Sequence, residues 1–184
     1  MKLIIIGTSC SGKSTLAGKV SEITGIEHIE LDYLQWLPDW QCRSEEEFRD
    51  LVKKAAKAEH WIIDGNYSIA RDIHWAAADM VIWLNYSFPI VFYRALKRSI
   101  KRMFSGEEVC NGNKETIGRT FFNRESILLW VIKTHRRRKD TYQQILDEHC
   151  KDAEIIIFRK PADAEKWLKE SAHNIMNYVA ADVS

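Results

Sequence analysis

The segment E-H-I-E-L at residues 27–31 predicts a short strand, and four short apolar runs recur along the chain, at residues 2–6, 61–63, 80–84 and 154–158. Such runs are typical of strands buried on both faces of a parallel sheet, because both sides of each strand then need apolar side chains. The segments between the runs carry apolar residues at helical spacing and predict helices. These helices cover about residues 12–24, 44–58 and 121–149, with a long one from residue 89 to beyond residue 102 and a last one starting at residue 161. Strands that alternate with helices predict an α/β fold with a parallel sheet.

Local signals fix the ends of several predicted elements. Gly25 follows the first helix and predicts its end, since glycine readily adopts the left-handed conformation found there. Ser44 and Glu47 have the spacing of a capping box, which predicts the start of the second helix. Pro161 suits the first turn of the last helix. Residues 33–40 are rich in aromatic side chains, contain a proline and predict a loop.

We expect a single domain over residues 1–184, a length that suffices for a sizeable core. The sequence has no internal repeat, low-complexity segment or interdomain linker. Residues 105–118 are polar and contain glycines, which predicts a loop or a small lid inserted into this domain.

Residues 7–15 read G-T-S-C-S-G-K-S-T and match the phosphate-loop pattern G-x-x-x-x-G-K-[ST] in full. A predicted strand precedes the motif and a helix follows it, as the motif requires. Gly7 and Gly12 permit a tight turn that points backbone N–H groups at phosphate oxygens, and the helix adds its positive dipole end. We expect Lys13 to act catalytically at the β- and γ-phosphates and the Ser14 hydroxyl to ligate Mg²⁺. The alternative is a glycine turn that binds nothing.

The loop therefore supplies most of the predicted nucleotide-binding residues. They are Gly7, Ser9, Cys10, Ser11, Gly12, Lys13, Ser14 and Thr15.

Two aspartates follow predicted strands and are candidates for the metal and the acceptor. Asp32 follows the second strand and Asp64 the third. Because ligands of open parallel sheets bind at the carboxyl ends of the strands, both should lie at the edge that holds the phosphate loop. We expect one to hold Mg²⁺ through water, assigned to Asp64, and the other to orient or deprotonate an acceptor hydroxyl, assigned to Asp32. Otherwise each is a loop or helix-capping aspartate.

Basic side chains are concentrated in one part of the chain. Residues 88–139 hold thirteen lysine or arginine residues and four acidic ones, a net charge of +9, whereas the whole chain carries +1 and the remainder therefore −8. Such a segment indicates a place where an anion is bound. Arg94, Arg98 and Arg102 share one helix face, and we expect Arg94 and Arg98 to contact the transferring phosphates. The other interpretation is a solvated basic face.

Other basic and aromatic residues are further candidates. Residues 135–139 read HRRRK, where Arg136 and Arg137 would complete the nucleotide site beneath a lid, unless the run is a nucleic-acid patch or a solvated surface. Arg71 is predicted to contact an anionic group of the acceptor. Four aromatic side chains either stack on a planar acceptor ring or pack in the protein. They are Tyr33, Trp36, Trp40 and Tyr67.

The overall composition is that of an ordinary globular protein. Hydrophobic residues make up 46% of the chain and charged residues 29%, which excludes a disordered chain. No apolar run reaches transmembrane length, and the net charge of +1 gives no argument for a membrane or nucleic-acid partner. The four cysteines are scattered, with no C-x-x-C pair, which favours free thiols and a cytoplasmic protein.

Three segments together resemble a known family. The phosphate loop, H-I-E-L-D-Y-L-Q-W-L-P-D-W at residues 28–40 and W-I-I-D-G-N-Y-S at residues 61–68 are similar to the bacterial DNA topology modulation protein (FlaR-like) group. Members of that group are adenylate-kinase-related P-loop proteins, and the similarity runs to about residue 168. The two aromatic segments are more specific than the loop, which many NTPases share.

The resemblance implies a three-layer P-loop NTPase fold with a five-stranded parallel sheet in the order 2-3-1-4-5. It implies that Asp64 and Gly65 correspond to the D-G of adenylate kinases and border the acceptor, and that Arg94 and Arg98 are lid-base arginines. This chain continues with Asn66 and Tyr67 where adenylate kinases have a phenylalanine-proline-arginine run, and residues 105–118 are short for a lid. Both differences argue against AMP as the acceptor.

The sequence therefore predicts an ATP-binding P-loop protein that uses Mg²⁺ and transfers the γ-phosphoryl group to a small acceptor. The acceptor would be a nucleoside, a nucleotide or another hydroxyl metabolite, and the residues do not identify it. The alternatives are a regulatory ATP-binding protein that acts through a partner, with a DNA-related role among the options, and a slow ATPase.

Overall fold

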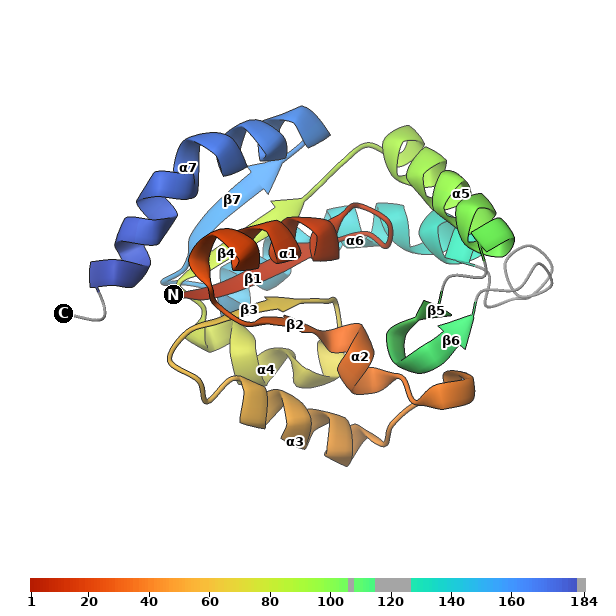
Figure 1. Cartoon of the computed structure of the whole chain (residues 1–184), viewed down its shortest axis with the longest axis horizontal. Coiled ribbons are helices and arrows are strands. Elements are labelled where there is room, and N and C mark those ends of the chain that lie inside the picture. Colours follow the sequence, from red (N-terminus) through yellow and green to blue (C-terminus); the bar gives the residue numbers. More distant parts are fainter. Residues whose placement is uncertain (106–107, 115–126, 182–184) are drawn as a thin grey trace.

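Five parallel strands form the centre of the protein, with helices on both faces of the sheet (Figure 1). The computed structural model describes residues 1–105, 108–114 and 127–181. The strands of the sheet are β1 (Lys2–Gly7), β2 (His28–Glu30), β3 (Trp61–Asp64), β4 (Met80–Leu84) and β7 (Glu154–Phe158). They are arranged as β2-β3-β1-β4-β7. Counted along the chain within this sheet, the order is the expected 2-3-1-4-5, so the predicted fold class is confirmed.

The helices and short 3-10 turns connect these strands. The longer helices are α1 (Lys13–Thr24), α3 (Glu45–Ala55), α5 (Phe88–Ser105), α6 (Ile127–His149) and α7 (Pro161–Ala181). The shorter elements are α2 (Leu31–Gln35), η1 (Pro38–Trp40), η2 (Ser68–Ala70), α4 (Arg71–His74) and η3 (Trp75–Ala77). A separate two-stranded hairpin consists of β5 (Glu108–Val109), η4 (Cys110–Gly112) and β6 (Asn113–Lys114).

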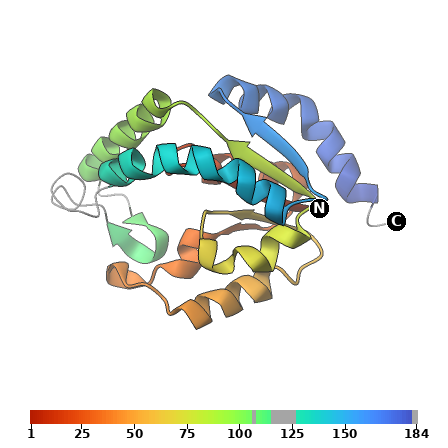
Figure 2. The ribbon, with the colours of Figure 1, turned by 180° about the vertical axis from the view of Figure 1, so that it is seen from behind.

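The two faces of the sheet are covered by different helices, and the central strand shows why. In β1, Leu3 and Ile5 pack in one apolar cluster with residues of α1, α5 and α7. Ile4 and Ile6 pack in a second cluster with residues of α3, η3 and α6. All four side chains are at most 1% exposed, so β1 needs an unbroken apolar run. Figure 2 shows α6 lying across the rear face of the sheet.

Several helix ends follow the predicted local signals. Gly25 caps α1 with a φ of 71° and donates its backbone N–H to the Ser21 carbonyl. Ser44 and Glu47 form the full capping box at the start of α3, which ends at Ala55 rather than near residue 58. In the part of the chain that the structure describes, no helix is long and apolar enough to cross a membrane.

Two segments differ from the sequence prediction. Residues 33–40 are not an open loop: α2 begins at Leu31, directly after β2, and η1 follows. Tertiary contact outweighs the aromatic and proline signal here, because Leu31 is fully buried between the sheet and α3. The sequence also gave no prediction for η2, α4 and η3. Within residues 105–118, the described part forms the hairpin, and the predicted start of the long helix at residues 121–126 lies outside the described residues.

Candidate functional site

The phosphate loop connects the central strand to α1. β1 ends at Gly7 and α1 begins at Lys13, and Gly12, at the N-cap, has a φ of 100°. A Cβ atom at Gly7 would lie 2.7 Å from the Ser11 hydroxyl and 2.8 Å from the Leu84 carbonyl, so only glycine fits there. No side chain caps the start of α1. The first backbone N–H groups of the helix are therefore suited to an anion such as a phosphate.

A carboxamide holds the loop in place from the neighbouring strand. The Asn66 side chain donates to the Gly7 carbonyl at 2.6 Å and accepts from the Gly7 N–H at 3.3 Å. Asn66 lies just after β3, so this two-way contact connects the base of the loop to the end of the adjacent strand. Only the tertiary structure shows this role, because the two residues are 59 positions apart.

Ser14 and Asp64 meet at the predicted metal position. The Ser14 hydroxyl donates to a carboxylate oxygen of Asp64 at 2.7 Å. The Asp64 residue is 3% exposed, and the His28 ring lies 3.4 Å from its other oxygen. Glu30 stands beside this pair, and burial, followed by the charge of Asp64, raises the pKa of the Glu30 carboxyl. Two carboxylates and a hydroxyl give the hard oxygen environment that Mg²⁺ prefers.

These oxygens fit Mg²⁺ bound with a nucleotide rather than a metal held by protein alone. Among the described residues, no group of three or more His, Cys, Asp or Glu side chains is placed to hold a metal ion. Mg²⁺ commonly keeps several waters and takes one or two protein ligands together with substrate phosphates. Ser14 would be such a ligand, and Asp64 would accept hydrogen bonds from the water shell.

Asp32 is the second residue of α2, two positions beyond the end of β2. The Tyr67 hydroxyl donates to one carboxylate oxygen of Asp32 at 2.7 Å, and the Tyr67 ring packs against Phe48 at 5.1 Å. Burial and the neighbouring Asp32 charge raise the pKa of Tyr67, so this phenol stays protonated as a donor. A carboxylate has two oxygens, so the bond from Tyr67 leaves capacity for an acceptor hydroxyl.

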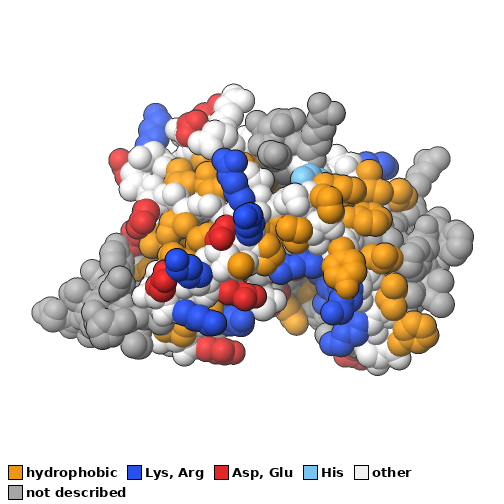
Figure 3. Space-filling view, turned by 90° about the horizontal axis from the view of Figure 1, so that it is seen from above, with side chains coloured by type: hydrophobic (Ala, Val, Ile, Leu, Met, Phe, Trp, Pro, Cys, Tyr) orange, Lys and Arg blue, Asp and Glu red, His pale blue; other side chains and the backbone are white. Residues whose placement is uncertain are grey.

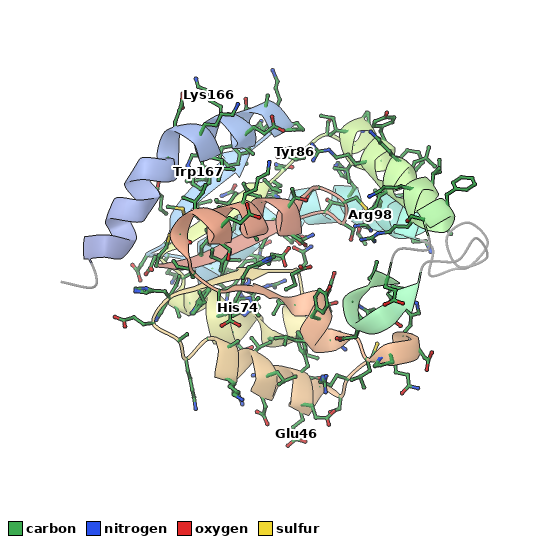
Figure 4. The ribbon with its side chains drawn as sticks, in the orientation of Figure 1. Glu46, His74, Tyr86, Arg98, Lys166 and Trp167 are labelled. Carbon is green, nitrogen blue, oxygen red and sulfur yellow. The ribbon has the colours of Figure 1, made fainter. Side chains whose placement is uncertain are left out.

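The arginines of α5 face the loop. Arg94 donates to the Ser11 carbonyl at 2.7 Å, and its guanidinium lies 5.4 Å from the centre of the Tyr86 ring. Arg98 and Arg102 line the same cleft, and Figure 4 shows Arg98 on the side of α5 towards the phosphate loop. Three arginines of one helix face therefore line the cleft that holds the loop, and their spacing predicted this shared face.

One cleft of about 1230 Å³ joins these groups. Most of the sequence-predicted site residues line it: Ser9, Cys10, Ser11, Gly12, Lys13, Ser14, Thr15, Asp32, Asp64, Gly65, Arg94 and Arg98. Its lining also includes Tyr33, Trp36, Trp40 and Tyr67, from α2 and the segments near it, and Tyr86, Ala164 and Leu168. Figure 1 shows α2 and α7, which carries Ala164 and Leu168, on opposite sides of α1. The structure thus brings the loop, the carboxylates and the arginines together.

Two predicted residues, Gly7 and Arg71, do not line this cleft, and the side chains of two more are not described. Gly7 is not among the lining residues, because it forms the turn beneath the loop. Arg71 is not among the lining residues either: its guanidinium lies over the Trp75 ring at 4.9 Å, and burial lowers its pKa. The unpredicted turn of η2 and α4 after Tyr67 carries Arg71 to that position. The side chains of Arg136 and Arg137 lie outside the described residues.

Sequence reasoning missed several lining residues. Glu30 ends β2 two positions before Asp32, so the strand-end rule that selected Asp32 could have selected it too. Val109, Cys110 and Leu168 reach the cleft from segments distant in sequence. No local pattern marks them, because their position depends on how the hairpin and α7 pack.

Comparison with protein-family models gives no match, and comparison with curated proteins gives none either. Solved structures do match. Shikimate kinase from Bacteroides thetaiotaomicron aligns with a TM-score of 0.55 at 13% identity over 94% of this chain and 97% of that chain. Shikimate kinase from Acinetobacter baumannii in complex with shikimate gives a TM-score of 0.56 at 14% identity over 96% and 93%. Deoxyadenosine kinase from M. mycoides with bound dATP gives 0.53 at 17% over 98% and 100%.

The chain has the fold of a P-loop kinase. At these identities the likeness establishes the fold and leaves substrate and activity open. The resemblance to the DNA topology modulation group is not confirmed by these matches.

Proposed function

We propose that this protein is a Mg-ATP-dependent kinase that transfers the γ-phosphoryl group of ATP to a hydroxyl of a small acceptor. The observation that carries the proposal is the single cleft in which the complete phosphate loop and the Ser14–Asp64 pair stand close to the Asp32 carboxylate. A nucleotide site and a carboxylate suited to a hydroxyl acceptor are the two parts that such a transfer requires.

At the nucleotide end, the backbone N–H groups of the loop and Lys13 bind the phosphates. Arg94 and Arg98 neutralise charge on the transferring group, where planar guanidinium groups suit phosphate oxygens. When bound, Mg²⁺ neutralises charge on the β- and γ-phosphate oxygens. Ser14 would be its direct protein ligand, and Asp64 would hold its water shell and orient the Ser14 hydroxyl.

At the acceptor end, Asp32 accepts the hydrogen bond of the attacking hydroxyl. The acceptor oxygen forms a bond to the γ-phosphorus, the bond from that phosphorus to the β–γ bridging oxygen breaks, and ADP leaves with the electron pair. The acceptor proton passes to the Asp32 carboxylate. Tyr67 fixes the carboxylate through its hydrogen bond, so that the second oxygen is held in one orientation.

Several observations support this assignment. The structural neighbours are shikimate kinases and a deoxyadenosine kinase, and all share the fold. The acceptor of this chain belongs to the same broad group of nucleosides, nucleotides or other hydroxyl metabolites. All four cysteines are free thiols, which supports a reducing compartment and therefore the cytoplasm.

A second candidate is a regulatory ATP-binding protein or slow ATPase that acts through a partner. The resemblance of residues 28–40 and 61–68 to the DNA topology modulation group favours it. This candidate predicts ATP binding without acceptor-stimulated turnover. It also predicts that the HRRRK run at residues 135–139 contacts the partner.

The deciding experiment measures ADP release from Mg-ATP with a panel of nucleosides, nucleotides and small hydroxy acids. We expect one acceptor class to stimulate ADP release and to yield a phosphorylated product in equal amount. Lys13→Ala should abolish both, and Asp32→Asn should abolish transfer while ATP still binds. ATP binding with no stimulation by any acceptor would overturn the kinase proposal in favour of the second candidate.

A further inference from the structure

The β5–β6 hairpin is attached to the segment that carries Asp32 by two asparagine side chains. Asn111 donates to the Tyr33 carbonyl at 2.9 Å and to the Trp36 carbonyl at 2.5 Å. Both contacts join residues about 75 positions apart, and η4 packs against α2. These bonds satisfy carbonyl groups near the end of α2 that have no partner further along the helix.

Asn113 makes the second attachment and is itself buried, with 3% of its surface exposed. It donates to the Leu37 carbonyl at 2.9 Å and to the Cys110 carbonyl at 2.8 Å, and it accepts from the Trp40 backbone N–H at 2.7 Å. A buried carboxamide with three partners fixes one arrangement of the groups around it, because losing any partner leaves a polar atom unsatisfied.

This attachment places the hairpin against the acceptor end of the cleft. Val109 and Cys110 line the cleft together with Tyr33 and Trp36. The Cys110 thiol lies near the Asp32 carboxylate. Burial, and then the charges of Asp32 and Glu30, raise the pKa of this thiol to about 11. The hairpin therefore borders the space in front of Asp32.

We propose that Asn111 and Asn113 form a clamp that makes the hairpin a fixed wall of the acceptor site, and that this wall, with Tyr33 and Trp36, selects an acceptor containing a flat unsaturated ring. The proposal rests on the proposed function for the statement that the ligand is a phosphoryl acceptor. The statement that the site binds a flat ring depends only on the residues that line the cleft.

The side chains in this compartment favour a flat ring over a saturated polar acceptor. Tyr33 is 49% exposed although it lines a cleft, so its ring surface is accessible to a ligand. Trp36 is partly buried and packs edge to face against Trp40 at 5.5 Å, which holds its orientation. The apolar Val109 side chain borders the same compartment. Aromatic side chains bind flat rings by stacking, and ligand sites commonly combine such apolar surfaces with a few polar groups that orient the ligand.

The clamp is tested with Asn111→Asp, which keeps the size of the side chain and replaces the donor by a carboxylate facing two carbonyl groups. Gln143→Glu is the matched control, since it makes the same chemical change on α6, where Gln143 donates to Asp147 at 3.2 Å. We expect Asn111→Asp to raise the KM for the acceptor by roughly tenfold or more, because two hydrogen bonds are lost. The Kd for ATP and the kcat at saturating acceptor should change by less than about threefold.

The ring preference is tested by direct calorimetric binding of adenosine and cytidine against methyl β-D-ribofuranoside, which has the sugar hydroxyls without the ring. We expect the ring compounds to bind and the methyl riboside to bind at least about tenfold more weakly. Tyr33→Ala should remove most of this difference. Tyr93→Ala should keep it: Tyr93 is 64% exposed on α5, whose outward side carries apolar side chains in Figure 3, and it does not line the cleft.

The outcomes separate this inference from the kinase proposal. If ring compounds bind with the expected dependence on Asn111 and Tyr33 but no transfer occurs, the inference holds and the kinase proposal fails. If transfer occurs equally well to ring-free acceptors, or if Asn111→Asp leaves acceptor binding unchanged, the inference is overturned and the kinase proposal stands. Failure of all ring compounds to bind the wild-type protein also overturns the inference. If Asn111→Asp weakens ATP binding and acceptor binding equally, the clamp only stabilises the fold in general, and the inference is overturned as well.

Discussion

The role of Ser14 could be predicted from the sequence, but its contacts could not. The motif assigned its hydroxyl to Mg²⁺ from spacing alone. The structure adds that this hydroxyl is held by Asp64, 50 positions away, and that Glu30 stands beside the pair. Asp64 could be selected because it ends a predicted strand, but Glu30 needed the structure to show that it faces the same hydroxyl.

Ser14→Ala should therefore weaken the Mg²⁺-dependent part of ATP binding by roughly 10–100-fold, because both the metal ligand and the Asp64 bond are lost. Ser14→Thr keeps the hydroxyl and should bind ATP within a few-fold of the wild type. The measurement is ATP titration with and without Mg²⁺. Equal Mg²⁺ dependence in Ser14→Ala and the wild type would show that Ser14 is not the metal ligand.

His74 provides a prediction about pH. Its residue is 1% exposed, its Nδ1–H donates to the Ala70 carbonyl at 3.0 Å, and burial lowers its pKa from 6.5 to about 4. The folded state thus holds the neutral ring, and the unfolded state binds the proton first as the pH falls. Its contribution to stability is present above pH 6.5 and is lost between pH 6.5 and about 4.

That loss should amount to about 3 kcal/mol at the acid end of the window, since each pKa unit corresponds to about 1.4 kcal/mol. His74→Asn keeps a donor near the Nδ1 position and does not titrate, so its free energy of unfolding should fall less steeply over the same range. Urea unfolding of both proteins at a series of pH values measures the difference. Parallel curves for the two proteins would contradict the prediction. His74, labelled in Figure 4, does not line the cleft, so activity at neutral pH should be unaffected.

At the scale of elements, the hydrophobic pattern predicted most strands and helices, and packing decided the rest. Four of the five strands of the sheet and the long helices carry apolar runs or helical spacing that do not depend on distant partners. The segment at residues 31–40 is different, because Leu31 is fully buried against the sheet and forces α2 to begin directly after β2. That early turn brings Asp32 and Tyr33 to the cleft instead of leaving them in an open loop.

The close contact between β3 and α2 depends on Gly65. It has a φ of 143°, and a Cβ atom there would lie 2.7 Å from the Leu31 Cβ. Gly65→Ala should therefore destabilise the protein by about 1–3 kcal/mol and raise the KM for the acceptor, because α2 must shift. Gly18, within α1, has no atom within 4 Å of an added Cβ.

Gly18→Ala is the matched control, and it should stabilise the protein by up to about 1 kcal/mol through helix propensity. Thermal and urea unfolding of the two variants measure the effects. A neutral Gly65→Ala with unchanged acceptor KM would contradict the claim that this contact positions α2.

At the scale of the whole molecule, the cleft joins parts of both apolar layers, so a bound nucleotide would connect them. The loop and α1 belong to one layer, while Asp32 and Tyr67 are attached to the other through Leu31 and Phe48. Ligand binding to the folded state alone stabilises it by mass action.

Mg-ATP at about 100 times its Kd should raise the free energy of unfolding by about 2.7 kcal/mol, and the Tm by roughly 5–10 °C. Differential scanning fluorimetry of the wild type and Lys13→Ala measures this effect, and the variant should show almost none of it. A rise of equal size in Lys13→Ala would place the nucleotide elsewhere than at the phosphate loop.

The sequence by itself determined the α/β fold, the strand order implied by the family resemblance and the identity of the phosphate loop. The fold class and the phosphate loop depend on local pattern: apolar runs for buried strands, and glycines with lysine and serine at fixed spacing for phosphate and metal. The strand order came from the resemblance alone. Only the tertiary structure decided that Arg71 stacks on Trp75 away from the cleft, that Asn66 braces the loop and that Asn111 and Asn113 attach the hairpin. These contacts join residues far apart in the chain, and their partners are backbone groups and ring faces, which leave no signature in the sequence around them.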